Sequence, residues 1–218
     1  MTTNHPAKFN DALIPIFAQV LIEHKCKNVF DPMAGTGKIV KVWDHDWNGD
    51  IYCNEIEPEW CDLGNGAWWS SHDAQRLPTQ DNFFDAICTS PTYGNRMADH
   101  HKAMDSSKRM TYTHQLGRTL DPSNTGKVQW GGRYRAMSRR ILESSMRVLR
   151  PSGIFIINIK DHRRRGEIMP VSDWYYTTMR ELGLFPLQVI IVNTPGMGFG
   201  ANLQNRITHE DIFVFQKD

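Results

Sequence analysis

The chain has 218 residues, of which 40% are hydrophobic and 22% charged, with a formal net charge of +1. This length suits one domain over residues 1–218, and no apolar run approaches the roughly 20 residues of a membrane span. The N-terminus lacks a signal-peptide pattern and the four cysteines have no CxxC spacing, which excludes a disulfide scaffold and indicates a cytoplasmic protein with reduced thiols.

The small net charge hides an uneven distribution. Residues 94–150 contain twelve Lys and Arg but four Asp and Glu, a balance of +8, whereas the rest of the chain contains thirteen against twenty. A basic block in an otherwise acidic chain indicates a surface that faces a polyanion. The alternative is a solvated helix face beside a basic loop.

Helical and extended patterns alternate along the chain. The predicted helices span 12–21, 39–43, 60–69, 134–149 and 171–182. The predicted strands span 28–30, 50–53, 70–72, 83–88, 153–159, 187–192 and 211–215. Residues 94–131 show no sustained periodicity and are expected to form a long basic loop, which is a candidate target-recognition insertion because structureless loops of this length are usually functional or disordered.

The order of these elements predicts an α/β fold. Strands alternate with helices until the end of the chain, where two strands follow each other directly. This order is typical of an open, mostly parallel sheet of seven strands with one antiparallel strand inserted near an edge. Ligands of such sheets bind beyond the carboxyl ends of the strands, so the turns that follow the strands are candidate sites.

A glycine turn with the sequence DPMAGTG follows the first strand, from Asp31 to Gly37. Its glycines allow the backbone to approach a ligand. The turn is not a phosphate-binding P-loop, because position 32 is proline and position 39 isoleucine, and it lacks the third glycine of the dinucleotide fingerprint. Glu55 ends the second strand, where it could bind ribose hydroxyls or be a plain surface carboxylate.

A second polar turn, TSPTYG, ends the fourth strand. It places a small hydroxyl at Ser90, a proline at Pro91 and an aromatic ring at Tyr93 directly after an apolar run that is predicted to be a buried strand. The alternative is a turn without a chemical role.

These stretches resemble motifs of the class I S-adenosylmethionine-dependent methyltransferases, and more narrowly of the DNA methyltransferases that modify cytosine N4 or adenine N6. DPMAGTG is similar to the family's DPFxGxG motif, NEIEP to its E-I-x-P stretch and TSPTYG to its (D/N/S)PP(Y/F/W) motif. HPAKF near the N-terminus and HEDIFVF near the C-terminus also resemble elements of the family. The resemblance covers nearly the whole chain and is weakest over 94–131.

The resemblance implies a Rossmann-like methyltransferase fold, S-adenosyl-L-methionine as cofactor and S-adenosyl-L-homocysteine as product. It implies catalytic roles for Ser90, Pro91 and Tyr93. Ser90 Oγ and the Pro91 carbonyl would accept hydrogen bonds from an amine conjugated to the base ring, a poor nucleophile because its lone pair is delocalised, and Tyr93 would stack on the base. Within the family, serine at the first motif position favours cytosine N4. Thr92 stands where the family has a second proline, so the turn lacks one fixed φ angle. The cofactor-binding residues that it implies are Lys8, Phe9, Asp31, Pro32, Ala34, Gly35, Gly37, Glu55, Asp73 and Ala74.

The expected substrate is double-stranded DNA with the target base flipped out of the helix. Basic and polar residues past the fourth and fifth strands are expected to bind it: Asn95, Arg96, Arg163, Arg164 and Arg165. A glycine-rich loop over 193–202 is a further candidate contact. The alternative for the three consecutive arginines is a solvated turn.

Several alternatives stay open at this point. The chain could be an RNA methyltransferase acting on guanine N2, or a catalytically silent subunit that binds cofactor or DNA. A carbon-5 cytosine methyltransferase is disfavoured because the sequence has no Pro-Cys, and the His and Cys spacing predicts no metal site. The SPTYGNRMADHH and QWGGRYR stretches are similar to DNA methylases of bacteriophages, which would place the protein in a host cytoplasm. A homodimer is left open.

Overall fold

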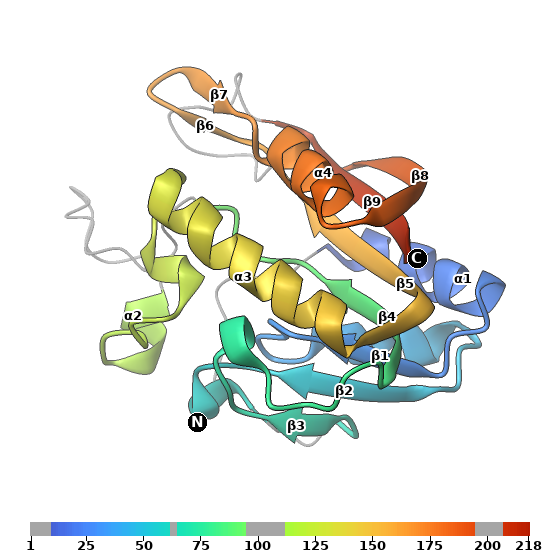
Figure 1. The fold of residues 1–218 in the computed structure, drawn as a ribbon. Coiled ribbons are helices and arrows are strands. Elements are labelled where there is room, and N and C mark those ends of the chain that lie inside the picture. The colour runs from blue at the N-terminus through green and yellow to red at the C-terminus, as the bar shows by residue number, and fades with distance from the viewer. Residues whose placement is uncertain (1–9, 62–64, 95–111, 195–206) are drawn as a thin grey trace.

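The computed structural model describes residues 10–61, 65–94, 112–194 and 207–218 (Figure 1). Several predicted site residues lie outside these ranges, namely Lys8, Phe9, Asn95 and Arg96. Most of the glycine-rich loop, over 195–206, also lies outside them.

One seven-stranded sheet organises the described residues, in the order β3-β2-β1-β4-β5-β9-β8 (Figure 1). The first five strands in this order run parallel, and β9 is antiparallel to both of its neighbours. This arrangement confirms the α/β prediction of a mostly parallel sheet with an antiparallel C-terminal strand. The strands are β1 (Asn28–Asp31), β2 (Asp50–Asn54), β3 (Trp68–Ser70), β4 (Phe84–Thr89), β5 (Leu149–Ile159), β8 (Leu184–Asn193) and β9 (His209–Lys217).

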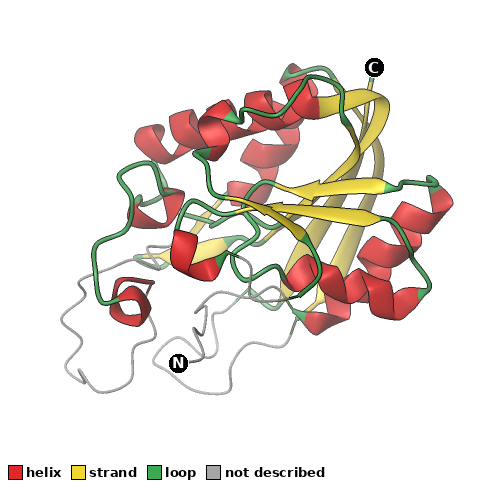
Figure 2. Ribbon diagram, turned by 90° about the horizontal axis from the view of Figure 1, so that it is seen from below, coloured by secondary structure: helices red, strands yellow, loops and turns green. Residues whose placement is uncertain are grey.

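Helices cover both faces of this sheet (Figure 2). Helix α1 (Ile14–Glu23) and the 3₁₀-helix η2 (Lys38–His45) pack on one face, and α3 (Gly132–Val148) and α4 (Val171–Glu181) pack on the other. In the described part of the chain, no helix is long and apolar enough to cross a membrane. The shorter helices are η1 (Asp11–Leu13), η3 (Pro58–Trp60), η4 (Ala74–Arg76), α2 (Tyr112–Leu116) and η5 (Thr125–Lys127).

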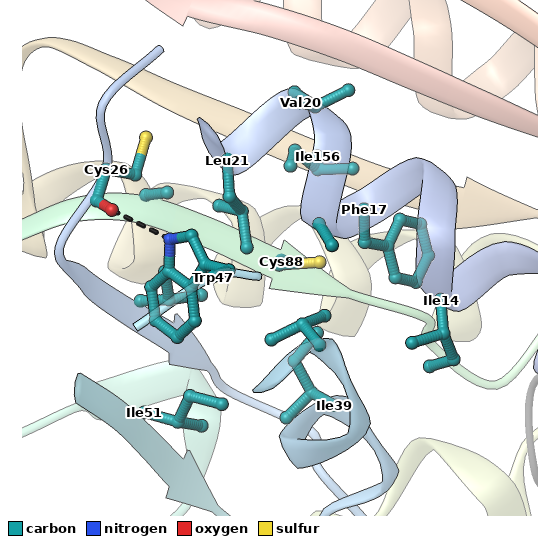
Figure 3. Packing of buried hydrophobic residues seen from close by; sticks show 14 of the residues in the cluster. Ile14, Phe17, Val20, Leu21, Cys26, Ile39, Trp47, Ile51, Cys88 and Ile156 are labelled. Carbon is teal, nitrogen blue, oxygen red and sulfur yellow. Dashed lines mark hydrogen bonds between the residues drawn. The ribbon is translucent and has the colours of Figure 1, made fainter. Parts of the chain in front are cut away.

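Strand β5 supplies both halves of the core, because its side chains alternate between the two faces. Ile154 and Ile156 join the cluster under α1, whereas Phe155 and Ile157 join the cluster under α3 and α4. In the first cluster, the buried Trp47 packs among aliphatic side chains and its indole N–H donates to the Cys26 carbonyl at 2.9 Å (Figure 3). This packing on both faces fixes the strand ends that carry the candidate site.

Two predicted helices between the first and fourth strands differ from the structure. The predicted helix over 60–69 is wrong, since Trp68 and Trp69 belong to β3 and pair with β2. Aromatic side chains favour an extended edge strand, and glycine, here with a φ of +85° at Gly66, disfavours a helix. The helix predicted over 39–43 is a 3₁₀-helix, bounded by left-handed residues at Gly37 and Asp46.

The segment predicted as a long loop over 94–131 is partly helical in its described portion. It contains α2 and η5, and its Tyr112 ring packs on the buried Trp60 with centroids 5.4 Å apart. Together with Leu120 these side chains form a small apolar cluster separate from the main core. Both helices are too short to produce a sequence periodicity.

The chain passes from α3 into β5 without the predicted connecting turn, because Leu149 already pairs with Phe84 in the sheet. After β5 the sequence prediction missed a hairpin, formed by β6 (His162–Arg164) and β7 (Glu167–Met169). Arg165 and Gly166 connect its strands with φ angles of +52° and +86°, as a tight two-residue hairpin turn requires. The three consecutive arginines therefore lie in a hairpin.

Candidate active site

The predicted catalytic and cofactor-binding residues that the structure describes lie at or just after the carboxyl ends of four adjacent parallel strands. Asp31 ends β1, Glu55 follows β2, Asp73 follows β3 and Ser90 follows β4. A side-chain hydrogen bond joins the ends of the neighbouring strands β4 and β1, because the Thr89 hydroxyl donates to Asp31 Oδ1 at 2.7 Å. The topology thus gathers residues that are up to about sixty positions apart along the chain.

The glycine turn (residues 31–37) is held against β2. Its Gly35 N–H donates to Glu55 Oε2 at 2.9 Å, and its Ala34 N–H donates to the Asn54 carbonyl at 2.9 Å. Gly37 has a φ of +71°, and a Cβ there would lie 2.5 Å from the Asn65 amide nitrogen. Only glycine therefore fits this part of the turn.

Asn54 is the residue that ties the turn to the neighbouring strands, and the sequence analysis did not single it out. Its amide nitrogen donates to the carbonyls of Pro32 and His72 at 3.1 and 2.9 Å. Its Oδ1 accepts from the Ser70 hydroxyl and the His72 N–H at 2.9 and 3.0 Å. The side chain is fully buried, and its donors and acceptor are matched by these partners. A polar residue at the end of the otherwise apolar β2 was the available signal.

Two carboxyl groups lie buried at this edge. Burial raises the pKa of Asp31 to about 7, against the opposing effect of hydrogen bonds from the Thr89 hydroxyl and the Met33 N–H. Burial also raises the pKa of Glu55 to about 7, although N–H groups of Glu57 and Gly35 donate to it. Carboxyl groups with such pKa values bind a proton readily near neutral pH. A bound cation or a hydroxyl donor stabilises their charged forms.

Asp73 and Ala74 lie at the start of η4, just beyond β3. The Asp73 carboxylate accepts from the Gln75 N–H at 2.9 Å and so caps this short helix. Its side chain is half-buried, whereas Ala74 is buried. Asp73 is therefore held in place while remaining accessible to a ligand.

The Ser90 turn (residues 89–94) carries a hydrogen-bonded cluster. Ser90 Oγ lies 2.8 Å from the Tyr93 hydroxyl oxygen. The amide nitrogen of Asn158, from β5, lies 3.2 Å from Ser90 Oγ and 3.0 Å from the Tyr93 hydroxyl. Burial and the nearby Glu210 carboxylate raise the pKa of Tyr93 above its ordinary value. Tyr93 therefore stays a neutral phenol, and Pro91 is buried beside it.

Behind this cluster lies a buried carboxylate. The Asn158 amide also donates to Glu210 Oε2 at 2.7 Å, and Lys160 lies 3.5 Å from Glu210 Oε1. The Lys160 ammonium in turn donates to the Thr194 hydroxyl at 2.8 Å. Asn158 is fully buried, and its Oδ1 has no hydrogen-bond partner in the described ranges. Asn158 is the one polar residue in the run IFIINI, a signal that the sequence prediction did not use.

Two groups stand out among the described basic residues of 94–150. One group is paired with acidic side chains, as Arg118 is with Glu59 and Arg147 with Asp81. The others in this group are Arg139 and Arg150. These arginines already have counter-charges, so the expected polyanion-facing surface is smaller than the sequence balance indicated.

The second basic group lies near the Ser90 turn. Arg133 and Arg135 are exposed at the start of α3, and the Arg135 guanidinium lies 5.9 Å from the centre of the Trp130 ring. Arg164 in the β6–β7 hairpin lies 3.4 Å from the Trp130 carbonyl. Figure 1 shows this hairpin projecting from the body above the first turns of α3. Within the described residues, no three His, Cys, Asp or Glu side chains are grouped to hold a metal ion.

Comparison with protein families gives one match. A family model for N6 and N4 methyltransferases, described as DNA methylase, matches residues 84–218. The match covers more than half of the chain and includes the Ser90 turn, β5, the β6–β7 hairpin and β9. Comparison with curated proteins gives no match.

Solved structures share the fold over most of the chain. A candidate sarcosine dimethylglycine methyltransferase from Galdieria sulphuraria has a TM-score of 0.59 and 12% identity, over 98% of this chain and 93% of that chain. A SAM-dependent methyltransferase from Methanosarcina mazei has a TM-score of 0.59 and 11% identity, over 91% and 96%. The N-methyltransferase NodS from Bradyrhizobium japonicum WM9 has a TM-score of 0.54 and 12% identity, over 95% and 98%. At these identities the similarity shows the fold alone.

Proposed function

The chain belongs to the DNA methylase family of N6 and N4 methyltransferases, and from this premise we propose that it methylates cytosine in DNA at N4, using the Ser90 turn. The observation that carries this proposal is the cluster of Ser90, Tyr93 and Asn158 at the end of β4. Either hydroxyl can donate between Ser90 and Tyr93. When Ser90 donates and accepts from Asn158, one Oγ lone pair remains to accept from an amine N–H. Adenine N6 is the other base amine that the family modifies.

S-adenosyl-L-methionine is the cofactor of this family, and it supplies a methyl group on a cationic sulfur. The residues present at the carboxyl edge fit it. Glu55 would accept hydrogen bonds from the ribose hydroxyls, and Asp73 would accept one from the adenine amine. The glycine turn, which Gly37 keeps free of side chains, would admit the methionine portion, with the buried Asp31 carboxyl beside it.

The protein contribution to the reaction is positioning and hydrogen bonding. Acceptors at Ser90 Oγ and the Pro91 carbonyl draw the amine hydrogens and favour a more tetrahedral nitrogen with a free lone pair. Tyr93 stacks on the base, which contributes about 1–3 kcal/mol. Because a sulfonium leaving group needs little acid catalysis, orientation of the amine accounts for much of the rate.

DNA would be held on the side of the hairpin and the start of α3. Arg163 and Arg165 are exposed on the hairpin and Arg164 is half-buried, while Arg133 and Arg135 extend the same basic surface. Asn95, Arg96 and the insertion over 94–131 stay predicted contributors to target recognition. A DNA substrate agrees with the expected cytoplasmic location. The homodimer and the bacteriophage origin remain predictions.

The test is mass spectrometry of nucleosides from unmethylated DNA and from RNA after incubation with the protein and S-adenosyl-L-methionine. The expected product is N4-methylcytosine in DNA. N6-methyladenine would correct the base and keep the family activity. Methylation found only in RNA, or no product with either nucleic acid, would contradict the proposal.

The matched variants are Ser90→Ala and Thr177→Ala. Ser90→Ala removes an acceptor for the amine, so transfer is expected to fall by about 100-fold or more, with the affinity for S-adenosyl-L-homocysteine unchanged in calorimetry. Thr177 is exposed on α4, so its variant removes a hydroxyl remote from the site and keeps wild-type activity. Full activity of Ser90→Ala would overturn the assignment of Ser90.

A further inference from the structure

Thr92, within the Ser90 turn, is held at two points. Its carbonyl oxygen accepts a hydrogen bond from the Tyr134 hydroxyl, which also lies 3.0 Å from the Tyr175 hydroxyl. Its own hydroxyl lies 2.8 Å from the hydroxyl of Thr125 in η5. Thr125 is 6% exposed and Tyr134 is fully buried. Water therefore replaces these contacts poorly, and losing one partner leaves a polar group unsatisfied.

The Ser90 turn has a second contact with the same part of the chain, two residues further on. The Gly94 carbonyl accepts from the Trp130 N–H at 2.8 Å. Gly94 has a φ of +68°, and a Cβ there would lie 2.8 Å from the Trp130 nitrogen. We call residues 118–130 the bridging segment, since the Ser90 turn is joined to it at both Thr92 and Gly94.

The other end of the bridging segment is anchored beside the candidate cofactor site. Glu57 is fully buried, and its Oε1 accepts from the Asp121 N–H and the Asn124 amide, each at 2.9 Å. Its Oε2 pairs with the Arg118 guanidinium at 2.8 Å. The Glu57 N–H donates to Glu55 Oε1 at 3.0 Å. The bridging segment therefore connects Glu55, which is proposed to bind ribose, through Glu57 with the Ser90 turn, which is proposed to bind the base.

We propose that Thr92 is a positioning residue for methyl transfer, whose hydroxyl fastens the Ser90 turn to Thr125 and so sets Ser90 relative to the cofactor edge. This inference rests on the proposed function. Threonine leaves φ free at a position where proline would restrict it, and the bond to Thr125 supplies a restraint through the side chain. Transfer between two bound groups is sensitive to small displacements of either one, so loosening this contact lowers the rate of transfer more than cofactor binding.

The test compares four variants of the full chain: Thr92→Val, Thr125→Val, the double variant and Thr92→Ser. Valine keeps the shape of threonine without the hydroxyl, and serine keeps the hydroxyl. Each single valine variant is expected to lower kcat about two- to tenfold, the range for one hydrogen bond. The double variant is expected to lose no more than either single variant, because both act on one contact. Thr92→Ser keeps the wild-type kcat, and all four keep the affinity for S-adenosyl-L-homocysteine.

A second readout does not depend on activity. Hydrogen exchange of the amides of Ser90 and of residues 92–94, measured without DNA, is expected to quicken in Thr92→Val and Thr125→Val and to stay unchanged in Thr92→Ser and Thr177→Ala. Unchanged exchange, a wild-type kcat in Thr92→Val, or losses that multiply in the double variant would each overturn the inference. A wild-type protein that methylates no nucleic acid would refute the proposed function, while the exchange data would still decide whether the contact restrains the turn.

Discussion

Two buried asparagines, Asn54 and Asn158, hold the polar side of the site together. Asn54 satisfies both ends of its amide with partners from the glycine turn and from the end of β3. Asn158 has two amide hydrogens and three neighbouring acceptors, namely Ser90, Tyr93 and Glu210. Both residues therefore act by positioning other groups. Substitution of either amide is expected to displace the turn that the amide supports.

Asn54→Asp is expected to destabilise the protein, since it replaces the donating amide with an oxygen that faces the carbonyls of Pro32 and His72. The expected loss is ~1–3 kcal/mol of unfolding free energy in urea titration, with weaker binding of S-adenosyl-L-homocysteine. Asn48→Asp is the control, because Asn48 is exposed and its Oδ1 only accepts from Lys27. Equal stability of the two variants would show that the Asn54 hydrogen bonds contribute nothing.

At the scale of elements, the arginines of α3 and those of the β6–β7 hairpin differ in their pairing with acidic side chains. Arg139 of α3 pairs with Glu143 in the same helix and with Glu181 of α4. This arginine therefore links the two helices. In the hairpin, Arg163 and Arg165 are exposed, and Arg163 donates to the Gly166 carbonyl at the turn. The hairpin is therefore the element expected to contact DNA phosphates.

Replacing Arg163 and Arg165 together by Gln is expected to reduce the slope of log affinity against log salt by about 2, since each phosphate contact contributes about 0.9. Fluorescence anisotropy with a duplex at several salt concentrations measures this slope. The control is Arg139→Gln with Arg180→Gln, which removes the same charge from the helices that cover the sheet. A slope that changes equally in both double variants would mean that only net charge matters, and that the hairpin has no specific role.

For the whole molecule, the buried Asp31 and Glu55 link stability to pH. Their ordinary pKa values are 3.8 and 4.5, and burial raises both to about 7 in the folded protein. The folded state thus binds protons more tightly than the unfolded state. The stability that these two groups contribute is fully present below about pH 4 and is lost as pH rises through about 7.

The check is the difference in unfolding free energy between the wild type and the Asp31→Asn, Glu55→Gln double variant, measured from pH 4 to 8. Relative to this variant, the wild type is expected to lose stability with rising pH, with a slope of up to ~1.4 kcal/mol per pH unit for each group. Asp173→Asn, at an exposed position of α4, is the control for removing a surface carboxyl group. A difference that grows in favour of the wild type at higher pH would contradict the buried, proton-binding state of the two carboxyl groups.

The sequence by itself determined the class of fold and the places where the candidate site would form. The apolar run of β5, the glycines at 35 and 37 and the turn beginning at Ser90 are local signals, because each reflects the burial or the backbone conformation of a few consecutive residues. Their order along the chain also predicted the parallel sheet, since strands alternate with helices up to its antiparallel end.

Only the tertiary structure decided which distant side chains meet. Asn158 and Glu210 are 52 residues apart and Thr92 and Thr125 are 33 apart, and no periodicity links such positions. From the sequence alone, Thr92 is therefore visible only as a threonine at the position of the family's second proline. The pairing of the α3 arginines likewise depends on which acidic side chains the packed helices bring near. Local patterns report the environment of single residues, whereas hydrogen bonds and ion pairs between elements exist only after the core has set the distances between those elements.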